Sequence, residues 1–178
     1  MSDHSNIQKL LVDAWAQRRE GQYDGARQLV AEAEASCAED DFRSLGRIYH
    51  IYAQFESDND KPAKALEYCR QSVAHYQQSG DRDKIAHATR HLADIERRLG
   101  NAEESELHYR HAIEIYRQNS STSAGDFANA LRGFALTLEQ REKTAEAIAT
   151  WEKVKEFYGK CNLQAGVDEA KERLAGLR

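Results

Sequence analysis

The chain has 178 residues, a net charge of −5 and a single proline, and 40% of its residues are hydrophobic. This length is sufficient for one domain with a buried core. The acidic balance argues against a general nucleic-acid binder, because such proteins present basic surfaces. Abundant Ala, Glu, Arg, Gln and Leu favour an almost entirely helical protein.

Targeting signals and disulfide patterns are absent from the printed sequence. No apolar run approaches the roughly 18 residues that span a bilayer, and the N-terminus has no basic segment followed by an apolar one. The cysteines Cys37, Cys69 and Cys161 are odd in number and far apart. We therefore expect free thiols in a cytoplasmic protein, with no signal peptide and no membrane contact.

Apolar residues recur at helical spacing in successive segments, and turn residues separate the segments. Pro62 falls where the first turn of a helix is expected, and Ser123 with Asp126 resembles a capping box. The Ser/Thr-rich stretch 118–125 is expected to be a loop. The pattern predicts one domain over 1–178, with helical hairpins at about 5–38, 42–78, 82–118 and 123–160 and a capping helix at 164–177.

Four copies of a spaced signature lie within these hairpins. Each copy begins with an alanine, has a small residue twelve positions later, a larger residue four further on, and a last position three beyond that. The copies are Ala14-Ala26-Val30-Ala33, Ala53-Ala65-Cys69-Ser72, Ala93-Ser105-Tyr109-Ala112 and Ala135-Ala147-Trp151-Val154. Successive copies are 39, 40 and 42 residues apart. One hairpin cannot bury its apolar faces alone, so the hairpins are expected to stack.

This signature resembles the tetratricopeptide repeat (TPR) family over about residues 5 to 160. The usual period is about 34 residues, so the chain is similar to the longer-period subclass found in kinesin light chain and in bacterial peptide-sensing regulators. HEAT-like hairpins, with a period of about 40 to 47 residues, are the alternative fold. The resemblance implies an all-α, α-α superhelix (TPR-like solenoid) of four helical hairpins plus a C-terminal capping helix.

The resemblance also implies that the first helix of each hairpin lines a concave groove. The groove residues proposed for partner binding are Trp15, Arg47, His50, Gln54, His87, Arg90, Asp94, Asn129 and Arg132. The cations of this set are arginines, which suit bidentate recognition of carboxylate or phosphate groups. The implied function is a non-catalytic scaffold that binds a partner peptide or helix, favouring acidic ones.

Structural explanations compete with this interpretation. Asp94 lies four residues after Arg90 and before Arg98, so part of the charge could be used within one helix. Arg18 near a helix end is explained by the helix dipole. Trp15 could either anchor a partner or pack within the first hairpin. Trp151 is expected in the core.

Two further alternatives remain open. His87, His91 and Asp94 share one helical face and have ligand types suited to zinc or iron, with His50 as an additional ligand, although nearby arginines would repel a cation. Self-association with the groove unused is the other alternative. Phosphate-loop, GxSxG and HExxH motifs are missing, so no catalytic residue, cofactor or nucleic-acid partner is expected.

Overall fold

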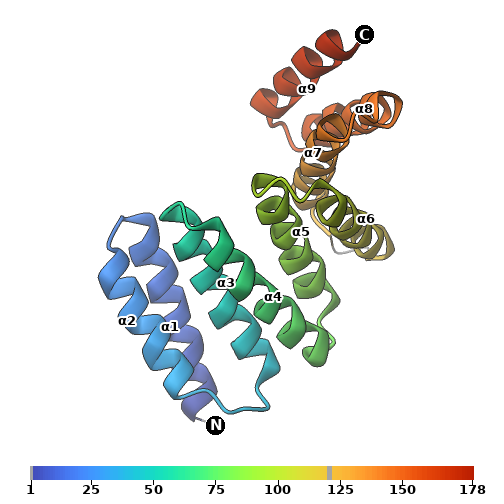
Figure 1. Ribbon diagram of the computed structural model, residues 1–178. Coiled ribbons are helices and arrows are strands. Elements are labelled where there is room, and N and C mark those ends of the chain that lie inside the picture. Colours follow the sequence, from blue (N-terminus) through green and yellow to red (C-terminus); the bar gives the residue numbers. More distant parts are fainter. Residues whose placement is uncertain (1, 120–121) are drawn as a thin grey trace. The chain divides into compact units, whose positions relative to one another are not determined.

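The computed structural model describes residues 2–119 and 122–178, and these fold as α-helices joined by turns (Figure 1). The chain divides into two compact units, Met1–Asp81 and Arg82–Arg178, each of which is described by itself. Among the described residues, no helix combines the length and the apolar character that crossing a bilayer requires.

The first unit contains two antiparallel hairpins. Its helices are α1 (Ser2–Arg19), α2 (Tyr23–Ala35), α3 (Phe42–Asp58) and α4 (Pro62–Ser79). Helix α1 pairs with α2, and α3 pairs with α4. Asp41 caps α3 by accepting a hydrogen bond from the backbone N–H of Ser44 at 3.0 Å. Gly80 ends α4 with a φ of 69°, which glycine adopts at little cost.

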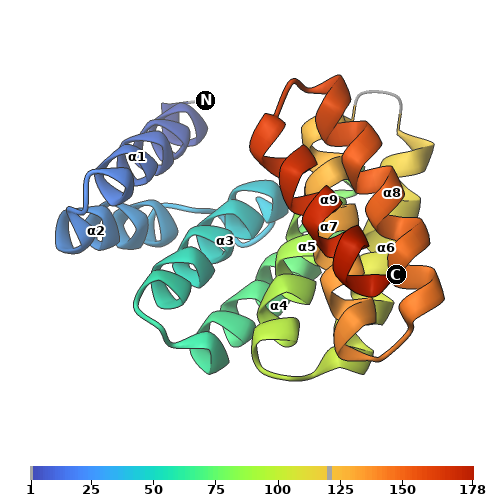
Figure 2. The same cartoon turned by 90° about the horizontal axis from the view of Figure 1, so that it is seen from above.

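The second unit contains two hairpins and one additional helix. Its helices are α5 (Arg82–Arg98), α6 (Ala102–Gln118), α7 (Ala124–Gln140), α8 (Thr144–Lys160) and α9 (Gln164–Leu177). Helix α9 packs against α8, as Figure 2 shows. The predicted cap of α7 is confirmed, because the Ser123 hydroxyl accepts a hydrogen bond from the backbone N–H of Asp126 at 3.0 Å.

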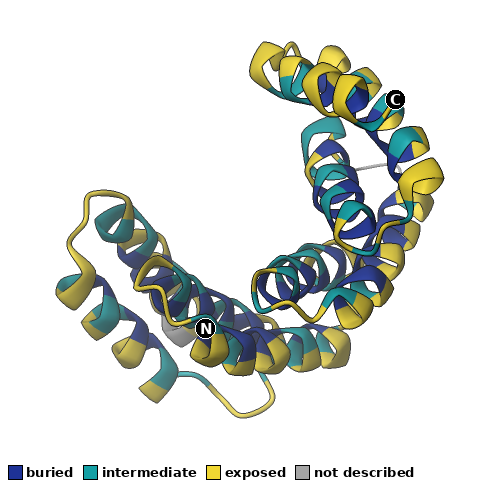
Figure 3. Ribbon diagram, turned by 45° about the horizontal axis from the view of Figure 1, so that its top comes forward, coloured by how far each residue is buried: buried dark blue, intermediate teal, exposed yellow. Residues whose placement is uncertain are grey.

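The repeat signature forms the core of both units. All its members, including Cys69 and Trp151, are 0% exposed. In Figure 3 the buried residues lie on the faces where the helices of a hairpin meet. The small members permit close approach of the two helices, and the larger ones fill the space beyond them. The predicted fold class, an all-α repeat of helical hairpins with a C-terminal helix, is thus confirmed.

The contact between the third and fourth hairpins shows how a large signature residue is used. The ring of Tyr109 in α6 lies directly against Gly133 in α7, where an added Cβ would lie 2.2 Å from the tyrosine oxygen. The Tyr109 hydroxyl donates a hydrogen bond to Asp94 in α5. One side chain therefore connects three helices of the second unit.

Ion pairs also connect neighbouring hairpins within each unit, with opposite polarity. In the first unit Arg27 of α2 donates to Glu56 of α3 at 2.8 Å. In the second unit Glu106 of α6 accepts from Arg141 and from Lys143, each at 2.8 Å. Arg27 and Glu106 occupy the same repeat position, directly after the second signature residue. The first junction therefore has its cation on the earlier hairpin, and the second has its cations on the later hairpin.

Candidate functional site

In the first unit, Arg47 of α3 is held by a neutral partner. Its Nη1 donates to Oε1 of Gln8 in α1 at 2.6 Å, and Nε2 of Gln8 donates to the Ser44 hydroxyl at 3.2 Å. Among the described residues, no carboxylate forms an ion pair with Arg47. The Arg47 guanidinium is partly buried and retains its full charge.

Trp15 and Gln54 meet through a third residue, Arg18. The Arg18 guanidinium lies 4.6 Å from the centre of the Trp15 ring, and its Nη2 donates to Gln54 at 3.4 Å. Arg18 also forms a two-point ion pair with Asp58, at 2.6 and 2.8 Å. Trp15 packs against the apolar core of the first unit and is partly buried. The dipole explanation of Arg18 is therefore incomplete, because this side chain connects α1 to the end of α3.

In the second unit, Arg90 is neutralised within its own helix. Its Nη1 donates to Asp94 at 3.1 Å and its Nη2 lies 2.8 Å from Nε2 of His91. The Arg90 side chain is only 12% exposed, and that of Asp94 is 31% exposed. Asp94 additionally accepts from Tyr109. Asp94 is thus a structural acceptor, which the sequence could suggest only through its spacing from Arg90.

The histidines of α5 lie in this same region. The rings of His87 and His91 form an edge-to-face contact with centres 4.6 Å apart. Burial, followed by the positive charge of Arg90, lowers the pKa of His87 to about 4. The guanidinium of Arg90 contacts both His91 and Asp94, and its charge opposes a metal ion at these two side chains.

Arg132 of α7 has a carboxylate partner that comes from α9. Its Nε and Nη2 donate to the two carboxylate oxygens of Glu169 at 2.6 and 2.7 Å. This pair is the planar, bidentate kind, and it raises the pKa of Arg132 above its usual value. Asn129 is exposed on α7, and its Oδ1 accepts from the Tyr158 hydroxyl at 2.7 Å.

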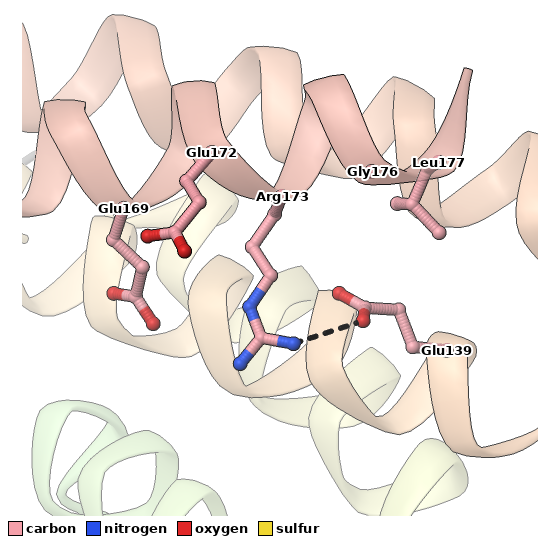
Figure 4. A pocket seen from close by; sticks show the side chains of 6 residues that line it. All are labelled: Glu139, Glu169, Glu172, Arg173, Gly176 and Leu177. Atoms are coloured by element: carbon pink, nitrogen blue, oxygen red, sulfur yellow. Dashed lines mark hydrogen bonds and ion pairs between the residues drawn. The ribbon is translucent and has the colours of Figure 1, made fainter.

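A hollow of about 540 Å³ lies beside this pair, between α7 and α9 (Figure 4). Its lining residues are Glu139, Glu169, Glu172, Arg173, Gly176 and Leu177. Arg173 donates to Glu139 at 3.3 Å across the hollow, while Figure 4 shows Glu172 beside it without a drawn partner. The surface beside Arg132, formed by α7 and α9, is therefore predominantly acidic, which was not predicted from the sequence.

The polar partners of the first-helix arginines lie about one repeat period away in the sequence. Gln8 and Arg47 are 39 residues apart, Arg132 and Glu169 are 37 apart, and Arg18 and Asp58 are 40 apart. Residues separated by about one period lie side by side on successive first helices, or on a first helix and the capping helix. The repeat period of 39 to 42 residues therefore leads from Arg18 to Asp58 and from Gln8 to Arg47, whereas Glu169 lies 37 residues from Arg132 and falls just outside it.

Comparisons with known proteins agree with this architecture. The tetratricopeptide repeat family model matches residues 44–118, which extend from α3 through α6. The crystal structure of BtubC (BKLC) from P. vanneervenii is similar, with a TM-score of 0.64 at 18% identity, covering 99% of this chain and 81% of that one. A comparison with curated proteins gave no match.

A second similar structure is the crystal structure of the nearly identical TPR-like repeats of a Podosopora anserina putative kinesin light chain. It has a TM-score of 0.69 at 14% identity, covering 97% of this chain and 95% of that one. The family match favours TPR over HEAT-like hairpins, and the structural likeness extends the fold to the remaining helices. Residues 44–118 therefore match the tetratricopeptide repeat family, and the chain has a TPR-like fold of helical hairpins.

Proposed function

We propose that this protein is a non-catalytic scaffold that binds an acidic segment of a partner protein on the first-helix face of its first unit. Tetratricopeptide repeats generally serve as protein-interaction scaffolds, so the general role follows from the fold. The site and the acidic character of the partner are the proposal. The observation that carries it is the state of Arg47, a charged guanidinium held by an amide.

Replacing the Gln8 amide by a partner carboxylate would improve the interactions of Arg47. Hydrogen bonds between ionised groups are roughly twice as strong as those between neutral groups. Gln8 is itself held by Ser44, so it keeps the guanidinium ordered before a partner arrives. Ordering in advance reduces the conformational entropy that binding costs.

The other proposed residues of this face lie on α3 and α1, and His50 among them is buried. His50 and Gln54 lie three and seven residues after Arg47, which places them on the same side of α3. Trp15, with Arg18 against its ring, adds a partly exposed aromatic surface. In this proposal a partner carboxylate contacts Arg47, while an apolar residue packs on Trp15.

The corresponding residues of the second unit take a smaller part in the proposal. Arg90 and Arg132 already have carboxylate partners, Asp94 and Glu169, so an acidic ligand would have to displace them. His87, Arg90, Asp94, Asn129 and Arg132 stay predicted groove residues, with Asn129 the most exposed contact among them.

Affinity capture from a host lysate with the full chain, followed by quantitative mass spectrometry, tests this proposal. We expect Arg47→Glu to reduce the recovery of bound partners at least tenfold, while its circular-dichroism melt stays close to that of the wild type. The matched control is Arg19→Glu, because Arg19 is an exposed arginine of α1 for which no partner is recorded among the described residues.

The conservative variant Arg47→Lys sharpens the test. Lysine keeps the charge and loses the planar two-point geometry, so we expect an intermediate loss of binding. Equal recovery by wild type and Arg47→Glu would contradict the proposed site. Recovery of the chain itself as the main partner, together with mass growth in a light-scattering concentration series, would instead support the self-association alternative.

The metal alternative and the domain organisation stay separate predictions. Metal analysis of protein purified without a histidine tag tests binding at His87, His91 and Asp94, and a stoichiometry near one would support it. The prediction that residues 1–178 form a single domain is tested by calorimetry, where one unfolding transition supports it and two contradict it.

A further inference from the structure

Three tyrosines form a partly exposed triangle on the second hairpin, outside the proposed groove residues. Tyr49 and Tyr52 come from α3 and Tyr68 comes from α4. Their ring centres are 6.3 Å (Tyr49–Tyr52), 6.2 Å (Tyr49–Tyr68) and 5.2 Å (Tyr52–Tyr68) apart. His75 extends the group by stacking on Tyr49, with ring centres 5.2 Å apart. All four side chains are partly buried, so each retains some exposed surface.

A single carboxylate from the first hairpin joins this triangle. The Tyr49 hydroxyl donates to Oε1 of Glu34 at 3.0 Å, and the Tyr52 hydroxyl donates to Oε2 at 2.9 Å. Among the described residues, Glu34 forms no ion pair with a lysine, arginine or histidine. Glu34 with Tyr49, Tyr52 and Tyr68 is called the Glu34 surface below.

The Glu34 surface has a negative electrostatic character. Burial, with the neighbouring carboxylate of Glu34 as a further cause, raises the pKa of Tyr49 and of Tyr52. Burial raises the pKa of Cys37 to about 11, and the charges of Asp41 and Glu34 act in the same direction. The tyrosines of α3 and Cys37, which follows the end of α2, therefore resist acquiring negative charge. The faces of aromatic rings are also negative because of their quadrupole.

The exposed side of Tyr68 already accommodates a cation from the same chain. The Nζ of Lys64 lies 5.8 Å from the centre of the Tyr68 ring, and the Lys64 side chain is 54% exposed. This geometry is that of a cation–π contact at a solvent-accessible site. Lys64 Nζ also lies 3.8 Å from the carboxylate of Glu56, so a partner cation that binds this ring displaces Lys64 toward Glu56 or solvent.

We propose that the Glu34 surface is a docking site for an arginine or lysine side chain of a partner protein. The ring centres are too close to admit a group between them, and His75 covers a face of Tyr49, so the cation lies over the ring of Tyr68 in the place of Lys64. There it gains the cation–π attraction and the charge of Glu34. This site would select basic segments, whereas the proposed Arg47 site selects acidic ones.

A pair of matched peptides tests this proposal on the intact protein. The probes are acetyl-Gly-Arg-Gly-amide and acetyl-Gly-citrulline-Gly-amide, which have nearly the same shape and differ in charge. Binding is followed by NMR of protein with ¹³C-labelled tyrosine rings. We expect the arginine peptide to shift the ring signals of Tyr49, Tyr52 and Tyr68, with saturation in the millimolar range, and the citrulline peptide to bind at least fivefold more weakly.

The variant Glu34→Gln removes the charge and keeps acceptor and donor atoms near the tyrosine hydroxyls. We expect it to weaken binding of the arginine peptide at least fivefold. Its control is Glu32→Gln, an exposed glutamate on the same helix, which we expect to bind like the wild type.

Equal shifts from both peptides, or unchanged binding by Glu34→Gln, would overturn the proposal, and so would tyrosine shifts that follow protein concentration alone. The comparison of the two peptides on the wild type needs no variant, so the test holds even if Glu34→Gln is unstable. Loss of partner binding by Arg47→Glu bears only on the other site.

Discussion

Arginines at related positions of the two units differ in their electrostatic state. In the first unit Arg47 contacts an amide, and in the second unit Arg90 and Arg132 contact carboxylates. All three lie on the first helix of a hairpin. Arg90 and Arg132 occupy the same repeat position, and Arg47 lies three residues earlier in its repeat. A groove arginine therefore cannot be assigned to ligand binding by position alone, because its partner on a neighbouring turn or helix determines whether its charge is available.

The same charge reversal in the two units should give the largest difference in stability. We expect Arg90→Glu to lower the free energy of unfolding by about 2–3 kcal/mol, because it removes the partner of Asp94 and places a second carboxylate beside it at a position that is 12% exposed. Arg47→Glu should cost less than about 1 kcal/mol, since it faces a neutral amide. Urea denaturation measures both, and similar losses for the two variants would contradict the distinction between the units.

Lowering the pH should have the next largest effect on stability, and most of this effect should come from His87 of α5. Burial and Arg90 lower the pKa of His87 to about 4, below its usual value near 6.5. Between these values the unfolded chain binds a proton that the folded chain does not, so stability falls as the pH is lowered from 7 to 5, by about 1–2 kcal/mol.

Variants at His87 in the second unit and His75 in the first unit show how much each histidine contributes to the loss of stability at low pH. His87→Asn should remove most of the loss between pH 7 and 5, which thermal melts at the two pH values would show. Burial also lowers the pKa of His75 in the first unit, so His75→Asn should act in the same direction. A pH response unchanged by His87→Asn would show that another group is responsible.

Releasing Arg132 from its ion pair with Glu169 should have the smallest effect on stability. Glu169→Gln removes the charge of a partly exposed pair, with side chains 40% and 27% exposed, so we expect a loss of about 0.5–1 kcal/mol. The freed guanidinium should then resemble that of Arg47 and accept an acidic ligand. Glu172→Gln on the same helix is the control, expected to change stability by less than about 0.5 kcal/mol. Equal binding of an acidic peptide by both variants would contradict this assignment.

The core was predictable because its signal is local and periodic. Ala93, Ser105 and Tyr109 lie within one hairpin at fixed offsets, and helical geometry alone brings them together. The pairing of Arg90 with Asp94 was also within reach, since four residues span about one helical turn. Sequence periodicity therefore identified both the fold and the explanation that competes with a groove site at Arg90.

The electrostatics of the candidate site depended on contacts between hairpins. Gln8 reaches Arg47, and Glu169 reaches Arg132, from the adjacent repeat or from the capping helix. Helix α9 lies outside the signature, so no repeat position assigned a role to Glu169. The Glu34 surface likewise combines residues from three helices, and its two hydroxyl contacts on one carboxylate follow from no spacing rule.

The reversed ion pairs between hairpins bear on how such a chain can be rearranged. Arg27 meets Glu56 at one junction, whereas Glu106 meets Arg141 and Lys143 at the other. If the first hairpin were spliced directly before the fourth, Arg27 would meet two cations instead of an anion, and like charges in partly buried positions repel. The hairpins are therefore not interchangeable building blocks. A shuffled order of hairpins would therefore bring like charges together at such a junction and weaken its packing.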